Sequence, residues 1–167
     1  MPARLVEFDP TYPKVIMPLP HLPLNAITIG AHADDWPTAI TAAGDALVRS
    51  GAATSAYTDR MIEVIREFGA YIVIAPGLAL AHARPGADVL TDGLCVVTLT
   101  EPVAFGHPHN DPVSVIVGLA VSGADDHLQF VAELANVFND PAVIPALAGA
   151  TTAEFVQGVF GQTEALA

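Results

Sequence analysis

The run VSVIVGLAV, residues 113–121, constrains the fold of this chain more than any other stretch. It is almost continuously apolar, whereas a strand with one solvated face alternates apolar and polar side chains. Such a run is typical of a strand covered on both faces, as in parallel or mixed sheets that lie between helices. We therefore expect a layered α/β domain.

The rest of the chain alternates between strand-like and helix-like patterns. Further strands are expected at 25–29 and 93–100, with an ordered, turn-rich loop at 101–112. Helices are expected over 38–49 behind a cap at Asp34 or Asp35, from a cap at Ser55 or Thr58 to Phe68, from about 126 to Phe138, and near 141–147 and 152–160. In the third of these helices the side chains expected to face inward are Leu128, Val131, Leu134, Ala135 and Phe138.

The first 23 residues differ from the remainder because they hold six prolines. Proline lacks a backbone N–H and restricts its neighbours, so this spacing prevents a helix and interrupts a strand ladder. We expect an extended N-terminal arm over 1–23 that wraps the domain or a second subunit, which leaves a homodimer open. The domain itself is expected over 24–167.

Composition excludes several classes of function. The 18 acidic side chains outnumber the 6 basic ones, and a net charge of −12 argues against binding nucleic acid. The single cysteine, Cys95, lies in an apolar run, where it is expected to pack as a small buried side chain. No apolar run approaches the roughly 20 residues of a membrane helix, and the N-terminus does not resemble a signal peptide. A cytoplasmic protein is expected.

The stretch YIVIAPGLALAHARP, residues 71–85, holds the first candidate site. Two short apolar runs are separated by Pro76-Gly77, and the second run ends on His82 with Arg84 two residues later. An imidazole followed by a guanidinium at the end of a buried run suits an anion better than it suits packing.

A second histidine, His127, opens the helix that follows the 113–121 strand. Strand ends and helix starts meet at the carboxyl edge of an open α/β sheet, where ligands bind. Backbone N–H groups at the helix start favour an anion there, although Asp125 and Asp126 partly oppose it. Spacing alone leaves open whether His82 and His127 converge or are two unrelated half-buried histidines.

The other histidines call for different interpretations. His107 and His109 form an H-x-H pattern with Asp111 close behind, so a zinc site is conceivable. A loop braced by hydrogen bonds from His107 and Asp111 is the interpretation we favour. His32 is expected at the surface or as a capping residue, and His21 at the surface.

Several motifs occur here in a recognisable order: APGLALAHARP, EPVAFGH, NDPV and DDHLQFVAEL. Together they resemble the enzyme IIA component of the bacterial sugar phosphotransferase system (PTS), in its mannitol/fructose-type superfamily and most of all in the ascorbate-type branch. The resemblance covers 24–160. It implies a mixed, mostly parallel β-sheet sandwiched between helices.

The resemblance also implies a phosphotransferase that works through a phosphohistidine and needs no cofactor and no metal. His82 would accept a phosphoryl group from the phosphocarrier protein HPr and pass it to a cysteine of a IIB component, and through it to the membrane component IIC. His127 would assist. The transported molecule would be a sugar or sugar acid, such as ascorbate. At Ala81 the chain differs from the family, which usually has proline before the active histidine.

Physical chemistry adds two expectations to these roles. Negative charge develops on three equatorial oxygens during phosphoryl transfer, and Arg84 and His127 could stabilise it. An apolar rim formed by Leu78, Leu80 and Ala81 is expected to dock a partner. Two rival hypotheses remain: a regulatory module on the same fold, without a transport partner, and a metal-dependent hydrolase that uses His82, His107, His109 and Asp111.

Overall fold

The computed structural model describes residues 19–161, which form one mixed sheet between two layers of helices. The strands are β1 (Ile27–Ala31), β2 (Val73–Ala75), β3 (Leu78–His82), β4 (Gly93–Val103) and β5 (Val113–Ala120). The helices are α1 (Trp36–Arg49), α2 (Ser55–Phe68), α3 (Ala124–Val137), α4 (Val143–Ala148) and α5 (Ala153–Val159), with short 3-10 turns at Leu24–Ala26 and Ala70–Ile72.

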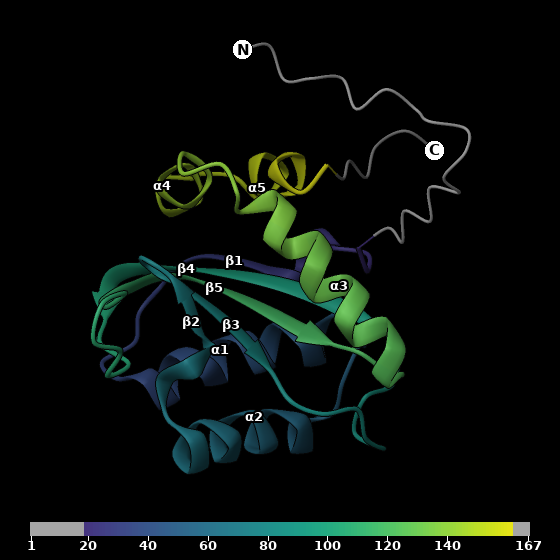
Figure 1. Cartoon of the computed structure of the whole chain (residues 1–167). Coiled ribbons are helices and arrows are strands. Elements are labelled where there is room, and N and C mark those ends of the chain that lie inside the picture. Colours follow the sequence, from purple (N-terminus) through teal and green to yellow (C-terminus); the bar gives the residue numbers. More distant parts are fainter. Residues whose placement is uncertain (1–18, 162–167) are drawn as a thin grey trace, which may run out of the picture.

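The strand order in the sheet is β1-β4-β5-β3-β2. The pairs β1–β4 and β3–β5 are parallel, whereas β4–β5 and β2–β3 are antiparallel. Helices α1 and α2 lie below the sheet in Figure 1, and α3, α4 and α5 lie above it. In β5, every residue except Ser114 is buried, as the apolar run predicts. The α/β class with a mixed sheet sandwiched between helices is confirmed.

The packing of α1 on the centre of the sheet depends on Gly118 in β5. A Cβ at this position would lie 2.3 Å from the Cys95 sulfur, so no larger residue fits there. The Cys95 thiol is fully buried and donates to the Ala43 carbonyl at 3.3 Å. Burial raises the pKa of this thiol to about 12, which keeps it protonated and unreactive. Cys95 is therefore a packing residue, as its sequence context predicts.

Most of the predicted helix and turn signals are confirmed. The Asp35 side chain caps α1 by accepting from the Thr38 N–H at 2.9 Å. Gly69 ends α2 with φ at +85°, a conformation that disfavours any residue with a Cβ. The predicted side-chain cap of α2 is wrong: the helix begins at Ser55, and the residue before it, Thr54, makes no side-chain capping bond.

Two further predictions need correction. Strand β4 continues through Glu101 to Val103, where we expected a loop, because Val103 pairs with Val113 beyond an irregularity in the ladder. Pro102, which has no N–H to donate, is tolerated at such an irregularity. In α3, Leu128 (72 % exposed) and Ala135 (also exposed) do not face inward as predicted, because Phe130 and Leu134 occupy the buried face.

The N-terminal segment meets the domain before β1. Leu22 is fully buried, and its carbonyl accepts a 2.8 Å hydrogen bond from the buried Gln157 side chain of α5. Most of the predicted proline-rich arm, residues 1–18, lies outside the described residues. None of the helices within 19–161 is both long and apolar enough to cross a membrane.

Candidate functional site

The site is built around His82, the last residue of β3. Its ring is half-buried, and Nδ1 lies 2.9 Å from the Leu80 carbonyl oxygen. Because a carbonyl oxygen can only accept, this contact requires the proton to be on Nδ1. The lone pair of the neutral ring is then on Nε2, which is the nitrogen able to act as a nucleophile.

His127, in the first turns of α3, lies beside His82. The two ring centroids are 5.1 Å apart, with the planes tilted by 41°. This geometry answers the question that the sequence left open, since the two histidines converge. Burial lowers the pKa of His127, and the nearby His82 lowers it further. Both effects favour the uncharged imidazole of His127 at neutral pH.

Tyr71 and Arg84 complete the surroundings of the His82 ring. The Tyr71 ring meets it edge-on, with centroids 6.1 Å apart. Burial raises the pKa of Tyr71, and the positive charge of Arg84, which lines the same groove, partly offsets that rise. Arg84 makes no ion pair with any residue in the 19–161 portion of the chain, so its charge is available to a ligand.

These side chains line a groove of about 990 Å³. One wall comes from α2, another from the segment after β3, and a third from the start of α3. The lining residues are Arg60, Glu63, Val64, Glu67, Phe68, Tyr71, His82, Ala83, Arg84, Pro85, Ala124, His127 and Leu128. Positive and negative charges share the groove: Arg60, Glu63 and Glu67 lie on α2, and Arg84 lies in the segment after β3.

The predicted apolar rim is wrong. Leu78, Leu80 and Ala81 are buried, because β3 lies between β2 and β5 and is covered by helices. The exposed apolar side chains at the groove are instead Phe68, Tyr71 and Leu128, with exposed fractions of 64 %, 48 % and 72 %. They come from three separate elements, so no single stretch of sequence reveals them.

Sequence reasoning also missed Arg60 on α2. Its guanidinium forms two 2.6 Å hydrogen bonds with the Asp88 carboxylate and a third, of 2.8 Å, with the Arg84 carbonyl. The bonds with Asp88 raise the pKa of Arg60 and lower that of Asp88. Arg60 therefore fixes the loop that follows His82. The single signal in the sequence was that Arg60 is one of only six basic residues.

The 105–111 loop is braced from within, as predicted. The Asp111 carboxylate accepts from the backbone N–H groups of Phe105, Gly106 and His107 at 2.7 to 3.1 Å. His107 Nδ1 accepts from the N–H groups of His109 and Asn110 at 3.1 and 3.0 Å. Within 19–161 no group of three His, Cys, Asp or Glu residues could hold a metal ion.

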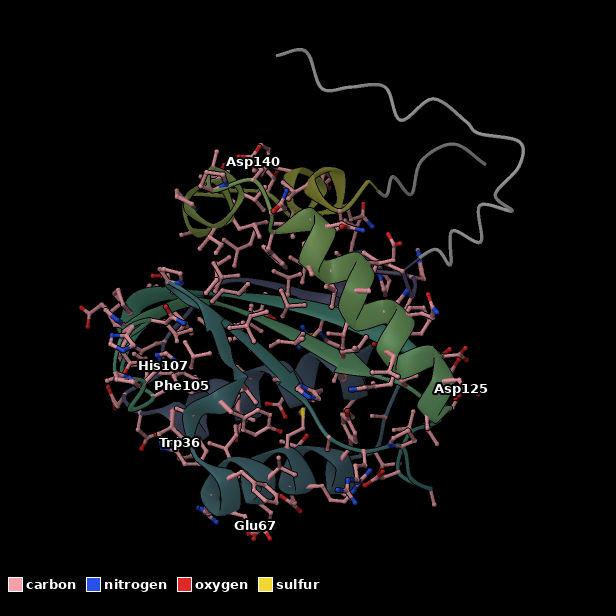
Figure 2. The ribbon with its side chains drawn as sticks, viewed as in Figure 1. Trp36, Glu67, Phe105, His107, Asp125 and Asp140 are labelled. Atoms are coloured by element: carbon pink, nitrogen blue, oxygen red, sulfur yellow. The ribbon has the colours of Figure 1, made fainter. Side chains whose placement is uncertain are left out.

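This loop is far from His82. The Asn110 carbonyl accepts from the N–H of Gly77, just before β3, whereas His82 ends that strand. Figure 2 shows His107 and Asp125, next to the site on α3, at opposite sides of the molecule. The four residues of the hydrolase hypothesis therefore do not come together. His32 is exposed and pairs with Asp34 at 3.1 Å, as expected for a surface residue.

Comparison with known proteins shows the family of this chain. The model of the family "Phosphoenolpyruvate-dependent sugar phosphotransferase system, EIIA 2" matches residues 21–162. The ascorbate-specific PTS system EIIA component of Salmonella typhimurium is 34 % identical over 144 residues, which are 86 % of this chain and 94 % of that protein. The chain belongs to the EIIA 2 family. Members of this family are phosphotransferases of the sugar PTS.

Solved EIIA structures share this fold. The crystal structure of PtxA from Streptococcus mutans is 32 % identical, covers 83 % of this chain and 88 % of its own, and superposes with a TM-score of 0.75. The IIA protein in a complex of mannitol enzyme IIA with phosphorylated enzyme IIB from Escherichia coli is 27 % identical, with a TM-score of 0.74. That match covers 86 % of this chain and 99 % of the Escherichia coli chain.

Proposed function

We propose that this EIIA 2 protein carries a phosphoryl group on His82, accepting it from phospho-HPr and passing it to a cysteine of a IIB component. The observation that carries the proposal is the Nδ1 contact of His82 with the Leu80 carbonyl. In the uncharged ring this contact leaves the lone pair on Nε2, and the His82 side chain lines the groove. A bond forms between Nε2 and phosphorus while the bond between phosphorus and the atom of phospho-HPr that carried it breaks. The proton stays on Nδ1.

The neighbours of His82 suit the charge that develops in this step. Phosphoryl transfer is catalysed mainly by positioning and by electrostatic stabilisation of the equatorial oxygens. The guanidinium of Arg84, which forms no ion pair within 19–161, lines the same groove and offers donors to the phosphoryl oxygens, and the His127 ring centroid lies 5.1 Å from that of His82. The lowered pKa of His127 favours its uncharged state, in which the ring can still donate one N–H to a phosphoryl oxygen.

Partner recognition in this proposal uses the exposed side chains of Phe68, Tyr71 and Leu128. An apolar rim of this kind docks a protein surface and excludes water from the transferring group. The complex of the Escherichia coli mannitol IIA with phosphorylated IIB supports a IIB partner. The ascorbate-specific relatives support an ascorbate-like sugar acid as the molecule that a membrane IIC component transports. The cytoplasmic location expected from the sequence is part of this proposal.

The direct test is incubation of the protein with phospho-HPr, followed by peptide mass spectrometry at a pH that preserves phosphohistidine. We expect one phosphoryl group, on the peptide that contains His82, and none in His82→Ala. The matched control is His109→Ala, which removes a histidine remote from the groove and should behave as the wild type. If His82→Ala still acquires acid-labile phosphate, the assignment is wrong.

The second step separates the carrier from the regulatory alternative. When an ascorbate-type IIB protein is added to the phosphorylated protein, a carrier loses its phosphoryl group to the IIB cysteine. A regulatory module keeps the group on His82 under the same conditions. Transfer therefore supports the proposal, and retention overturns it.

A further inference from the structure

Behind the groove, and not among its lining residues, is the buried tyrosine Tyr57 of α2, only 1 % exposed. Its hydroxyl reaches the carboxyl ends of β3 and β5, where those neighbouring parallel strands separate. Tyr57 is thus in contact with the backbone that carries the site while remaining inaccessible to any partner.

The Tyr57 hydroxyl makes one hydrogen bond to each strand end. It accepts from the N–H of Ala83 at 2.9 Å and donates to the Leu119 carbonyl at 2.6 Å. The Ala83 carbonyl is also near, at 3.3 Å, but a hydroxyl has a single proton and the shorter contact takes it. One side chain therefore joins the ends of two strands.

These two backbone groups lie in the segments that carry the two histidines of the site. Ala83 follows His82 directly, and Leu119 is in register with His82 across the sheet. From Leu119 the chain continues into α3, which carries His127. The Tyr57 hydroxyl thus sets the separation between the backbone that holds the nucleophile and the backbone that leads to its assisting imidazole.

Arg60, one helical turn beyond Tyr57, reinforces the same segment. Its guanidinium carbon lies 5.4 Å from the centre of the Tyr57 ring, and its Nη2 donates to the Arg84 carbonyl at 2.8 Å. The residues after His82 are therefore attached to α2 at both Ala83 and Arg84.

The phenol has no role in proton transfer. Burial raises the pKa of Tyr57 to about 12, so the hydroxyl keeps its proton at any physiological pH. Its contribution is geometric, and geometry matters here because a displacement of about 1 Å in a catalytic group can reduce a rate about 10²-fold.

We propose that Tyr57 is a positioning residue for phosphoryl transfer, whose hydroxyl holds the ends of β3 and β5 so that His82 and His127 face the same phosphoryl group. This inference rests on the proposed function of His82.

The test compares Tyr57→Phe with Thr98→Val. Each substitution removes one buried hydroxyl while keeping most of the shape of its side chain. Each deprives one backbone N–H of its partner, Ala83 N–H in the first case and Gly30 N–H in the second. Tyr57→Phe also deprives the Leu119 carbonyl of its hydrogen bond from the phenol. Thr98 is 2 % exposed and pairs with Val115, toward the opposite end of β5 from Leu119. Both variants are expected to lose thermal stability, and Tyr57→Phe somewhat more, which is why uptake is compared per folded molecule.

Phosphoryl uptake from phospho-HPr is then measured per folded molecule. We expect kcat of Tyr57→Phe to fall about 10- to 100-fold. KM should stay within about twofold, because Tyr57 touches no partner. Thr98→Val should retain both constants. Wild-type kcat in Tyr57→Phe, or an equal loss in Thr98→Val, overturns the proposal.

A second measurement separates this proposal from the proposed function. In ¹H–¹⁵N NMR spectra of the unphosphorylated protein, the wild type should show the Nδ1–H tautomer of His82. Tyr57→Phe should show both tautomers, and Thr98→Val should match the wild type. If the wild type accepts no phosphoryl group, the proposed function fails. The NMR result is independent of that outcome. A His82 spectrum unchanged in Tyr57→Phe would overturn the positioning role, and a mixture of tautomers would support it.

Discussion

Two histidine clusters lie at the two ends of β3, and they differ in how their ring nitrogens are used. At the end of the strand, His82 lines the groove, donates Nδ1–H to the Leu80 carbonyl and keeps its lone pair on Nε2. Near its start, His107 uses Nδ1 to accept two backbone N–H groups of its own loop. In the first cluster, the Nε2 lone pair of His82 is available as a nucleophile. In the second, the Nδ1 lone pair of His107 accepts hydrogen bonds that hold the loop.

The surroundings of the two clusters differ in the same way. Beside His82 are a second imidazole and an arginine without a carboxylate partner in the described part of the chain. Beside His107 is Asp111, whose carboxylate is occupied by three backbone N–H groups. Figure 2 shows how far the His107 loop lies from the α3 end of the molecule. A histidine-rich motif therefore indicates chemistry only where its hydrogen bonds leave a nitrogen free.

After the complete loss expected for His82→Ala, the largest expected effect comes from the second imidazole of the site. His127→Gln removes the ring that faces His82, and phosphoryl uptake should fall about 10²-fold, as when one preorganised donor to a developing charge is lost. Stopped-flow or quench measurements with phospho-HPr give the rate. His109→Gln, in the other cluster, is the control and should retain the wild-type rate. Equal rates of phosphoryl uptake in the two variants would contradict the proposed difference between the two clusters.

The next effect concerns stability at the other cluster. Asp111→Ala deprives three backbone N–H groups of a charged acceptor, and we expect the free energy of unfolding to drop by about 2 kcal/mol in this partly exposed loop. Urea denaturation measures the loss. Phosphoryl uptake per folded molecule should be unchanged.

The matched control for this variant is Asp140→Ala. The exposed Asp140 carboxylate accepts the Ala142 N–H, so its loss should cost under about 1 kcal/mol. A slow phosphoryl uptake in Asp111→Ala would show that the loop contributes to the site after all.

The smallest effect is a pH dependence of stability from His127. Its pKa is lowered in the folded state, first by burial and then by His82, relative to about 6.5 in the unfolded chain. As the pH falls below about 6.5, the unfolded chain binds a proton here before the native protein does, which favours unfolding. The stabilising contribution is complete above the unfolded pKa and is lost as the pH falls through the folded one.

Denaturation curves between about pH 7.5 and about pH 5 test whether stability falls on acidification as predicted. This range spans the ordinary pKa of histidine, about 6.5. The wild type should lose more stability on acidification than His127→Gln does. An identical pH dependence in both proteins would mean that His127 titrates normally and is not held uncharged by its site.

The fold and the two histidines could be predicted from the sequence because short stretches of the chain indicate them. The 113–121 run is apolar throughout, Gly69 and Pro76-Gly77 mark turns, and His82 and His127 follow strand-like segments. The predictions that failed concern which side chains are buried, and that depends on how the elements pack. Leu128 was expected inside, yet the buried face of α3 belongs to Phe130, and the predicted rim at Leu78 and Leu80 is covered.

Tyr57 shows the limit of such reasoning. Its hydroxyl contacts backbone groups 26 and 62 residues away in the sequence, and backbone groups carry no residue identity that a motif could reveal. In the sequence Tyr57 is one more apolar position of a helix. Only the assembled sheet shows that its polar atom joins the two strand ends of the site.

The measurement that tests the central claim most directly is the identification of the phosphorylated nitrogen. ³¹P and ¹H–¹⁵N NMR of the protein after reaction with phospho-HPr distinguish the two isomers of phosphohistidine. The hydrogen bond from His82 Nδ1 to the Leu80 carbonyl predicts phosphate on Nε2, with the Nδ1 proton retained. Phosphate on Nδ1 of His82 would contradict this account of the site.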